Sequence, residues 1–292
     1  MTPNDHSPNG DLTSHWILLR GLARESRHWG AFPEMLRGGL AKLGDTARVD
    51  AIDLPGTGRY SEMKSPLSVG EMTEFAREKF NEIRKAMRAR GETPPERTRI
   101  LAVSLGGMIA ADWIERWPKD FAEAVFINTS FKSFSPVHHR LKPSAMVHLL
   151  SHMRRLPTVE RELLSLKLVS NRTDIEENKS VATEWSKFAD ERPVSLENFS
   201  RQLFAASSFK APARAPTLPL LVVYSEHDRM VDPRCSQEII RRWKTAQAVH
   251  KTAGHDLTLD DPEWVIAQTL AWEWGLNEVP VPETASAAGV SK

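Results

Sequence analysis

Short apolar runs alternate along the chain with stretches of helical periodicity. The apolar runs cover residues 16–19, 49–52, 99–103, 124–127, 219–224 and 246–250. Runs of this kind are typical of strands that are buried on both faces. Strands that alternate with helices form a mostly parallel sheet. The pattern therefore predicts an α/β fold, with a doubly wound, mostly parallel sheet covered by helices on both faces.

The clearest predicted helix covers residues 68–90. Its apolar residues recur every three or four positions and share one face: Val69, Met72, Phe75, Ala76, Phe80, Ile83 and Met87. Ser68 and Glu71 form a capping box at its start, and Gly91 follows its end. The sequence therefore predicts a long amphipathic helix here.

A long segment separates the fourth and fifth predicted strands. Residues 131–215 are too many for a connection inside such a sheet. Their spacing is helical throughout, with prolines between the helical stretches, so they predict an inserted helical cap. The sheet core then comprises residues 14–130 and 216–277. The two ends, residues 1–13 and 278–292, are expected to be disordered tails.

Composition narrows the class of protein. The 39 Lys and Arg residues against 38 Asp and Glu give a net charge of +1, so no nucleic-acid partner is expected. Cys235 is the single cysteine, which excludes an internal disulfide and a metal site built from several thiolates. Neither an apolar run long enough to span a membrane nor a signal-peptide pattern occurs. We therefore expect a cytoplasmic protein without stable membrane insertion.

Ser104 is the first candidate for chemistry. It lies in Ala102-Val103-Ser104-Leu105-Gly106, directly after a predicted strand and directly before a predicted helix. This arrangement, with small residues two positions before and two after the serine, is typical of a nucleophile elbow. Taken alone, Ser104 fits equally well as the N-cap of an ordinary helix.

Asp228 and His255 complete a candidate triad. Each follows a different predicted strand, as Ser104 does, and the chain order is Ser, Asp, His. Because the carboxyl ends of parallel strands meet at one edge of a sheet, the three side chains are predicted to converge there. Asp232 and Glu226 are rival acids, and His250 is a rival base. Asp232 fits better as a helix cap before a proline, and the other two lie within or at the end of strands.

The three side chains have complementary chemistry. The hydroxyl of Ser104 is a weak nucleophile until a base removes its proton, which His255 could do. Asp228 would orient the imidazole and stabilise its charged form. The backbone N–H of Leu105, next to the nucleophile, would stabilise the oxyanion.

With these residues in place, the chain resembles serine hydrolases of the α/β-hydrolase fold, similar to esterases and lipases with a helical cap. The resemblance covers about residues 14–276 and rests on five motifs: Arg20-Gly21-Leu22, Asp53 to Gly58, Ser104 to Met108, Asp228 with Asp232-Pro233, and Gly254-His255 with Asp261-Pro262. It implies a second oxyanion donor in the backbone N–H of Leu22. It also places Trp29 and Val103 in the pocket wall.

Two positions depart from the family pattern. Arg20 stands where the family often has His, which leaves the shape of the oxyanion loop open. Val103 stands where a polar or aromatic residue is frequent. The nucleophile is a serine, not an aspartate, which argues against the dehalogenases and epoxide hydrolases that share the fold.

The expected function is hydrolysis of a small-molecule carboxylic ester, without cofactor or metal. The same triad would support acyl transfer, C–C bond hydrolysis, perhydrolysis or lyase chemistry. A non-catalytic ligand-binding protein is a third class. Residues 131–172 hold eight Lys and Arg against two acidic residues, which fits a solvated helix face or a cap attracted to an anionic lipid or substrate. His148 and His152 are read as polar cap residues.

Overall fold

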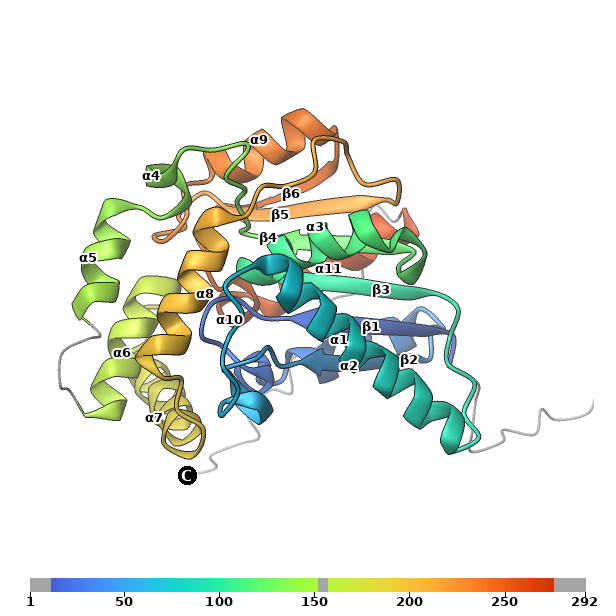
Figure 1. Cartoon of the computed structure of the whole chain (residues 1–292), viewed down its shortest axis with the longest axis horizontal. Coiled ribbons are helices and arrows are strands. Elements are labelled where there is room, and N and C mark those ends of the chain that lie inside the picture. Colours follow the sequence, from blue (N-terminus) through green and yellow to red (C-terminus); the bar gives the residue numbers. More distant parts are fainter. Residues whose placement is uncertain (1–11, 152–156, 276–292) are drawn as a thin grey trace, which may run out of the picture.

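In the computed structural model, the described part of the chain comprises residues 12–151 and 157–275, without the side chains of residues 148–151. Its sheet has six strands, all parallel, in the order β2-β1-β3-β4-β5-β6 (Figure 1). The strands are β1 (Ser14–Leu19), β2 (Ala47–Ile52), β3 (Thr98–Val103), β4 (Glu123–Ile127), β5 (Leu220–Ser225) and β6 (Ala246–His250). The strand order reverses at β1, and in doubly wound sheets ligands bind beyond the carboxyl ends of the strands at such a reversal, here those of β1 and β3.

Alternate residues of the strands face two separate apolar layers. On one face, Ile17, Ile100 and Ala102 belong to a core that includes apolar residues of helices α2 (Val69–Ala89), α3 (Leu105–Arg116) and α9 (Arg234–Trp243). On the other face, Trp16 and Leu101 pack with residues of α1 (Phe32–Lys42) and α11 (Pro262–Trp274). The sheet is therefore buried on both sides, which explains why its strands read as apolar runs.

A short helix, α10 (Leu257–Asp260), directly precedes α11. Ser68 is the N-cap of α2, as predicted, since its side chain accepts a hydrogen bond from the N–H of Glu71. None of the helices in the described ranges is long and apolar enough to cross a membrane.

Five helices occupy the predicted insert. They are α4 (Val137–Arg140), α5 (Pro143–Ser151), α6 (Thr158–Val169), α7 (Ile175–Glu191) and α8 (Leu196–Ser208). Figure 1 shows them gathered at one end of the sheet, from green to orange. Helices α5, α6 and α7 share a small apolar core, against which Met230 and Leu259 of the sheet region pack. We refer to α4–α8 as the cap helices; among the described residues from 131 to 215 there is no strand.

The predicted strands are confirmed, and no strand end differs from its prediction by more than two residues. Two details differ from expectation. The N–H of Thr13 donates to the carbonyl of Thr46 at 2.9 Å, so the first predicted tail ends before this residue. Helix α9 has Pro233 at its N-cap, whereas the side chain of Asp232 accepts from the N–H of Arg234 at 3.0 Å. The rest of both predicted tails, other than residue 12, lies outside the described residues.

Candidate active site

Ser104 lies in the tight turn between β3 and α3. Its backbone has φ 55° and ψ −115°, a strained conformation for a residue with a side chain. The N–H of Ser104 donates to the carbonyl of Ile127 at 2.9 Å. Its own carbonyl accepts from the hydroxyl of Thr129 at 2.7 Å. These bonds hold the strained strand–turn–helix geometry that a nucleophile elbow requires.

The small residues around Ser104 are required by close backbone approach. A Cβ on Gly106 would lie 2.5 Å from the carbonyl oxygen of Leu19 and 2.9 Å from that of Arg20. Ala102, on the other side of the serine, is fully buried. The sequence prediction about the two flanking positions therefore has a direct steric basis at Gly106.

Asp228 and His255 are hydrogen-bonded to each other. The Nδ1 atom of His255 lies 2.6 Å from Oδ2 of Asp228. The other carboxylate oxygen of Asp228 accepts from the N–H groups of Met230 at 2.7 Å and Val231 at 2.9 Å. Both side chains are buried, with 2% exposure for Asp228 and 5% for His255. The acceptor role of Asp228 requires the proton of His255 on Nδ1, which leaves Nε2 as the basic atom.

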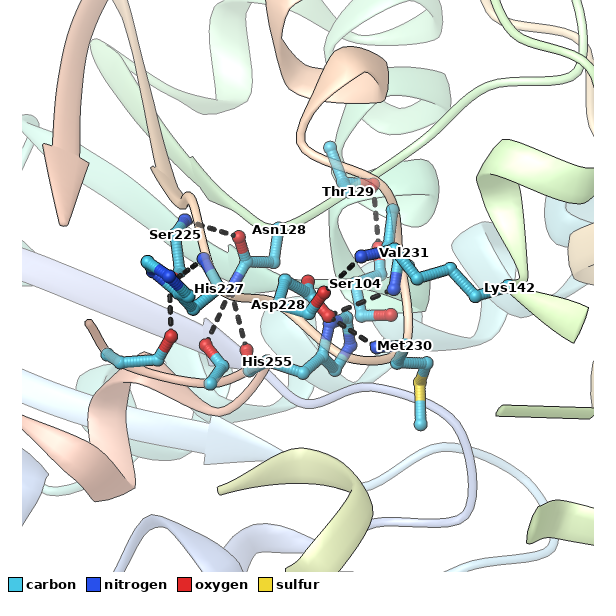
Figure 2. A network of polar contacts seen from close by, with 12 residues as sticks. Ser104, Asn128, Thr129, Lys142, Ser225, His227, Asp228, Met230, Val231 and His255 are labelled. Atoms are coloured by element: carbon cyan, nitrogen blue, oxygen red, sulfur yellow. Dashed lines mark hydrogen bonds and ion pairs between the residues drawn. The ribbon is translucent and has the colours of Figure 1, made fainter. Parts of the chain in front are cut away.

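The end of β4 connects the two halves of this arrangement. Ile127 accepts from the N–H of Ser104, and the next residue, Asn128, donates from Nδ2 to the carbonyl of His255 at 2.7 Å. The Oδ1 atom of Asn128 accepts from the N–H of Ser225 at 3.0 Å. Figure 2 shows Ser104, Asp228 and His255 together in this polar network. Two consecutive residues thus hold the backbones of the candidate nucleophile and the candidate base.

The loop after β1 lies against the nucleophile. A Cβ on Gly21 would lie 3.1 Å from Cβ and 3.7 Å from Oγ of Ser104. In the part of the chain that the structure describes, no group accepts a hydrogen bond from the N–H of Leu22 or of Leu105. Both N–H groups belong to segments that border Ser104 and remain free to donate to an oxyanion.

A cap residue holds this loop in place. Ala23 has a left-handed backbone with φ 56°, and its N–H donates to Oε1 of Gln202 at 2.9 Å. Gln202 lies on α8 and is fully buried. Its Nε2 donates to the carbonyl of Pro55 at 3.3 Å and to the hydroxyl of Ser65 at 3.2 Å. One cap side chain therefore joins the loop after β1 to the connection between β2 and α2.

Arg20 reaches from the same loop to the residue after the candidate base. Its Nη1 donates to Oδ1 of Asp256 at 3.2 Å and to Oγ1 of Thr258 at 3.0 Å, and its Nη2 contacts Oδ2 of Asp256. The guanidinium also lies 4.8 Å from the ring centre of Trp29. Burial alone would raise the pKa of Asp256, but the charge of Arg20 holds that pKa below its usual value.

Further along this loop, two side chains contact the cap. Arg24 pairs with Glu162 at 3.0 Å and lies 4.2 Å from the ring centre of Trp185. His28 packs edge-on against Trp185, with ring centres 5.1 Å apart. Burial, with the nearby charge of Arg24, holds the pKa of His28 well below its usual value, so the ring is neutral in this contact.

The basic cap segment is partly engaged inside the protein. Lys142 donates from Nζ to the backbone carbonyl of Asp228 at 2.6 Å. Arg140 donates from Nη1 to the carbonyl of Ser207 at 3.0 Å, at the end of α8. The side chains of His148 and His152 lie outside the described residues, so their assignment as polar cap residues that bind no metal stays a prediction. An interfacial role for this segment also stays a prediction.

The rival acids and base have other partners. Asp232 pairs with Arg234 at 2.7 Å, and the ion pair holds its pKa at about 2. Glu226 pairs with Lys251 at 2.7 Å. His250 lies 3.1 Å from Asp261. Each of these three side chains is therefore paired with a residue other than Asp228 or His255.

The two expected wall residues lie in the core. Trp29 and Val103 are each 3% exposed and belong to the apolar layer under α1 and α11. Trp29 packs against Phe32 and beneath Arg20, so it supports the loop that follows β1. A wall role for either residue stays a prediction. Among the described residues, no group of three or more His, Cys, Asp or Glu is placed to hold a metal ion.

Comparison with known proteins assigns the family. The profile of the α/β-hydrolase family described as serine aminopeptidase, S33, matches residues 39–262. The chain belongs to this family. A search of curated proteins finds none that matches the sequence.

Solved structures agree with the family assignment at the level of fold. The esterase RhEst1 from Rhodococcus sp. ECU1013 is 18% identical, with 90% of this chain and 91% of that chain covered and a TM-score of 0.64. A thermophilic esterase from Thermogutta terrifontis is 16% identical, with 91% of each chain covered and a TM-score of 0.60. A 2-hydroxy-6-oxo-6-phenylhexa-2,4-dienoate hydrolase from Rhodococcus sp. strain RHA1 is 18% identical, with coverages of 90% and 91% and a TM-score of 0.64. At these identities the likeness shows the α/β-hydrolase fold alone.

Proposed function

We propose that the protein is a serine hydrolase that cleaves carboxylic esters through an acyl-enzyme. The observation that carries this proposal is the buried 2.6 Å hydrogen bond between Asp228 and His255, beside the strained turn of Ser104. Membership of an α/β-hydrolase family supports enzymatic hydrolysis in general. The choice of an ester as substrate, and of these three residues as the triad, is our inference.

In the first half-reaction, Nε2 of His255 takes the proton from Oγ of Ser104 as the oxygen attacks the ester carbonyl. The tetrahedral oxyanion accepts hydrogen bonds from the N–H groups of Leu22 and Leu105, at the start of α3. His255 then passes its proton to the leaving alkoxide, which departs as an alcohol. The acyl group remains bonded to Oγ of Ser104.

In the second half-reaction, a water molecule gives a proton to Nε2 of His255 and attacks the acyl carbonyl. Collapse of this intermediate breaks the acyl–oxygen bond and returns the proton to Oγ of Ser104. The carboxylic acid is released. Asp228 accepts the Nδ1 proton throughout and stabilises the transient imidazolium. The cap helices lie over this edge of the sheet, where they would select the acyl group and limit the access of water.

The test is the hydrolysis of p-nitrophenyl esters of increasing acyl length by the wild type and by Ser104→Ala. Ser133→Ala is a matched control, because Ser133 is exposed and its hydroxyl donates to the backbone carbonyl of Ala211 at 3.4 Å. We expect kcat/KM to fall by about 10³-fold or more in Ser104→Ala and to stay within about twofold in the control. Ester turnover that survives in Ser104→Ala would contradict the proposal.

Two additions to the assay test acyl transfer and amide cleavage, which the same triad would support. An added alcohol or thiol traps the acyl group if transfer competes with hydrolysis. An aminoacyl p-nitroanilide tests whether the protein cleaves amides, as an aminopeptidase of the matched family would. A wild type that cleaves the anilide and none of the esters would overturn the choice of substrate while leaving the triad in place.

A further inference from the structure

We infer that Arg20 and Asp256 act as a positioning pair that links the oxyanion loop to the loop of the general base. The inference rests on the proposed function, since it assigns a role within the same site. Arg20 directly precedes Gly21 and Leu22, and Asp256 directly follows His255. The pair therefore spans the two loops whose relative placement decides whether base and oxyanion donors act on the same carbonyl.

The contacts of the pair are buried and directional. Arg20 is 4% exposed and Asp256 is 3% exposed. Both carboxylate oxygens receive bonds from the two terminal nitrogens of the guanidinium, which is the bidentate geometry that fixes orientation as well as distance. Thr258 closes the arrangement, because it accepts from Arg20 at 3.0 Å and donates to Asp256 at 2.8 Å.

Further contacts tie each partner to its surroundings. The N–H of Asp256 donates to the carbonyl of Val169 on α6 at 2.7 Å. The guanidinium of Arg20 packs on the ring of Trp29. Bond rotation in either partner is thus restricted from both sides, and a shift of one loop must be followed by the other.

The pair also sets the charge beside His255. As an ion pair it contributes no net charge, whereas either partner alone would leave an uncompensated charge in a buried place. A histidine at position 20 would balance Asp256 only when protonated, so arginine keeps the balance across the whole pH range.

Other titratable or charged groups face His255 or the pair. Among them, the charge of Arg20 contributes to the lowered pKa of His28, and the charge of Asp256 contributes to the raised pKa of Asp260. Asp228 binds Nδ1 of the ring. Asp260, on α10, accepts from the N–H of Gly254 at 2.6 Å. From the cap side, Lys142 binds the carbonyl of Asp228, and the charge of Arg24 acts on Asp256. The test therefore relies on the opposite directions expected for the two single variants, and not on either variant alone.

The test compares the pH profile of kcat/KM in the wild type, Arg20→Gln, Asp256→Asn and the double variant. Loss of Arg20 leaves a negative charge that favours imidazolium, so the acid limb of the profile moves to higher pH. Loss of Asp256 leaves a positive charge and moves the acid limb to lower pH. We expect each shift to be roughly half a pH unit or more, and the double variant to return to the wild-type midpoint.

The positioning role adds a second readout. Both single variants and the double variant are expected to lose about tenfold in kcat with KM changed by less than about twofold, because the loops are no longer fixed for the transition state. Arg20→Lys keeps the charge and loses the bidentate geometry, so its acid limb stays in place while its kcat falls. Arg77→Gln, on α2, is the control, because it breaks a partly exposed ion pair with Asp120, at 2.6 Å, outside the two loops.

Three outcomes overturn the inference: acid limbs that do not move in Arg20→Gln and Asp256→Asn, acid limbs that move in the same direction in these two variants, or an unchanged kcat in the double variant. If the single variants do not fold, the double variant and Arg20→Lys decide by their kcat and acid limbs. Failure of the proposed function is distinguishable, because the wild type would then hydrolyse no ester at any pH.

Discussion

The Nδ2 atom of Asn128 donates a 2.7 Å hydrogen bond to the backbone carbonyl of His255. Asn128 also adopts a left-handed backbone with φ 47°, a conformation that asparagine tolerates better than most residues. Its side-chain amide group thus connects the end of β4 to the loop that carries the candidate base. Its side-chain oxygen Oδ1 connects the end of β4 to β5, because it accepts from the N–H of Ser225.

We therefore expect Asn128→Ala to impair both folding and turnover. The buried N–H of Ser225 would lose its acceptor, which costs about 1–3 kcal/mol in the free energy of unfolding. The loop of His255 would lose its link to β4, so kcat should fall by about tenfold. Urea unfolding and ester kinetics on one preparation measure both effects. An unchanged kcat would show that the loop of His255 is held without Asn128.

Gln202 supplies a test of the contact between the cap and the oxyanion loop. In Gln202→Leu, the N–H of Ala23 loses its acceptor, and the neighbouring N–H of Leu22 loses its fixed direction. We expect kcat to fall by about tenfold, with a smaller effect on KM. Phe204→Ala is the control on the same helix, since Phe204 is 56% exposed. Equal kcat values for both variants would argue against this role of Gln202.

Two glycines provide a matched pair for stability. In Gly106→Ala, the added methyl would lie 2.5 Å from a backbone oxygen of Leu19, so the elbow must shift. We expect a loss of about 2–3 kcal/mol in the free energy of unfolding, together with lower activity. In Gly38→Ala, on α1, the methyl meets nothing within 4 Å, and the better helix propensity should stabilise the protein by about 0.5–1 kcal/mol. Thermal unfolding of both variants checks the prediction, which an undisturbed Gly106→Ala would contradict.

Glu273 should make the stability of the fold depend on pH. Burial raises its pKa from 4.5 to about 8, against the opposing charge of Arg99. Between these values the folded chain holds a proton that the unfolded chain releases. The contribution of Glu273 to stability is therefore complete below pH 4.5 and is lost as the pH rises through about 8.

Glu273→Gln removes this titration while keeping a neutral side chain of similar shape. We expect the difference in melting temperature between this variant and the wild type to grow in favour of the variant from pH 5 to pH 8. A difference in melting temperature that stays constant across this pH range would mean that Glu273 is ionised in the folded protein.

The sequence predicts much of the scaffold because the relevant signals are local. The apolar runs locate all six strands of the described sheet, and Ser68 with Glu71 locates the start of α2. The positions of Ser104, Asp228 and His255 follow from one rule, that side chains after parallel strands meet at the carboxyl edge.

The supporting contacts could not be predicted in the same way. Gln202 on α8 meets Ala23, and Arg20 meets Asp256, across long separations in sequence. Nothing in the local pattern around either residue specifies its partner, because the pairing depends on how the cap and the loops pack. In the sequence, Arg20 stands out only as a departure from the family pattern, and Asn128 has no feature that indicates its role beyond its place after a strand.

The central claim is that Ser104 is an activated nucleophile, and covalent labelling tests it most directly. The wild type, Ser104→Ala and the exposed-site control Ser133→Ala would be treated with a fluorophosphonate, digested and mapped by mass spectrometry. We predict one phosphonate adduct, on the peptide that contains Ser104, in the wild type and the control, and none in Ser104→Ala. An adduct on another residue, or a folded wild type that hydrolyses esters without forming an adduct at Ser104, would contradict the account.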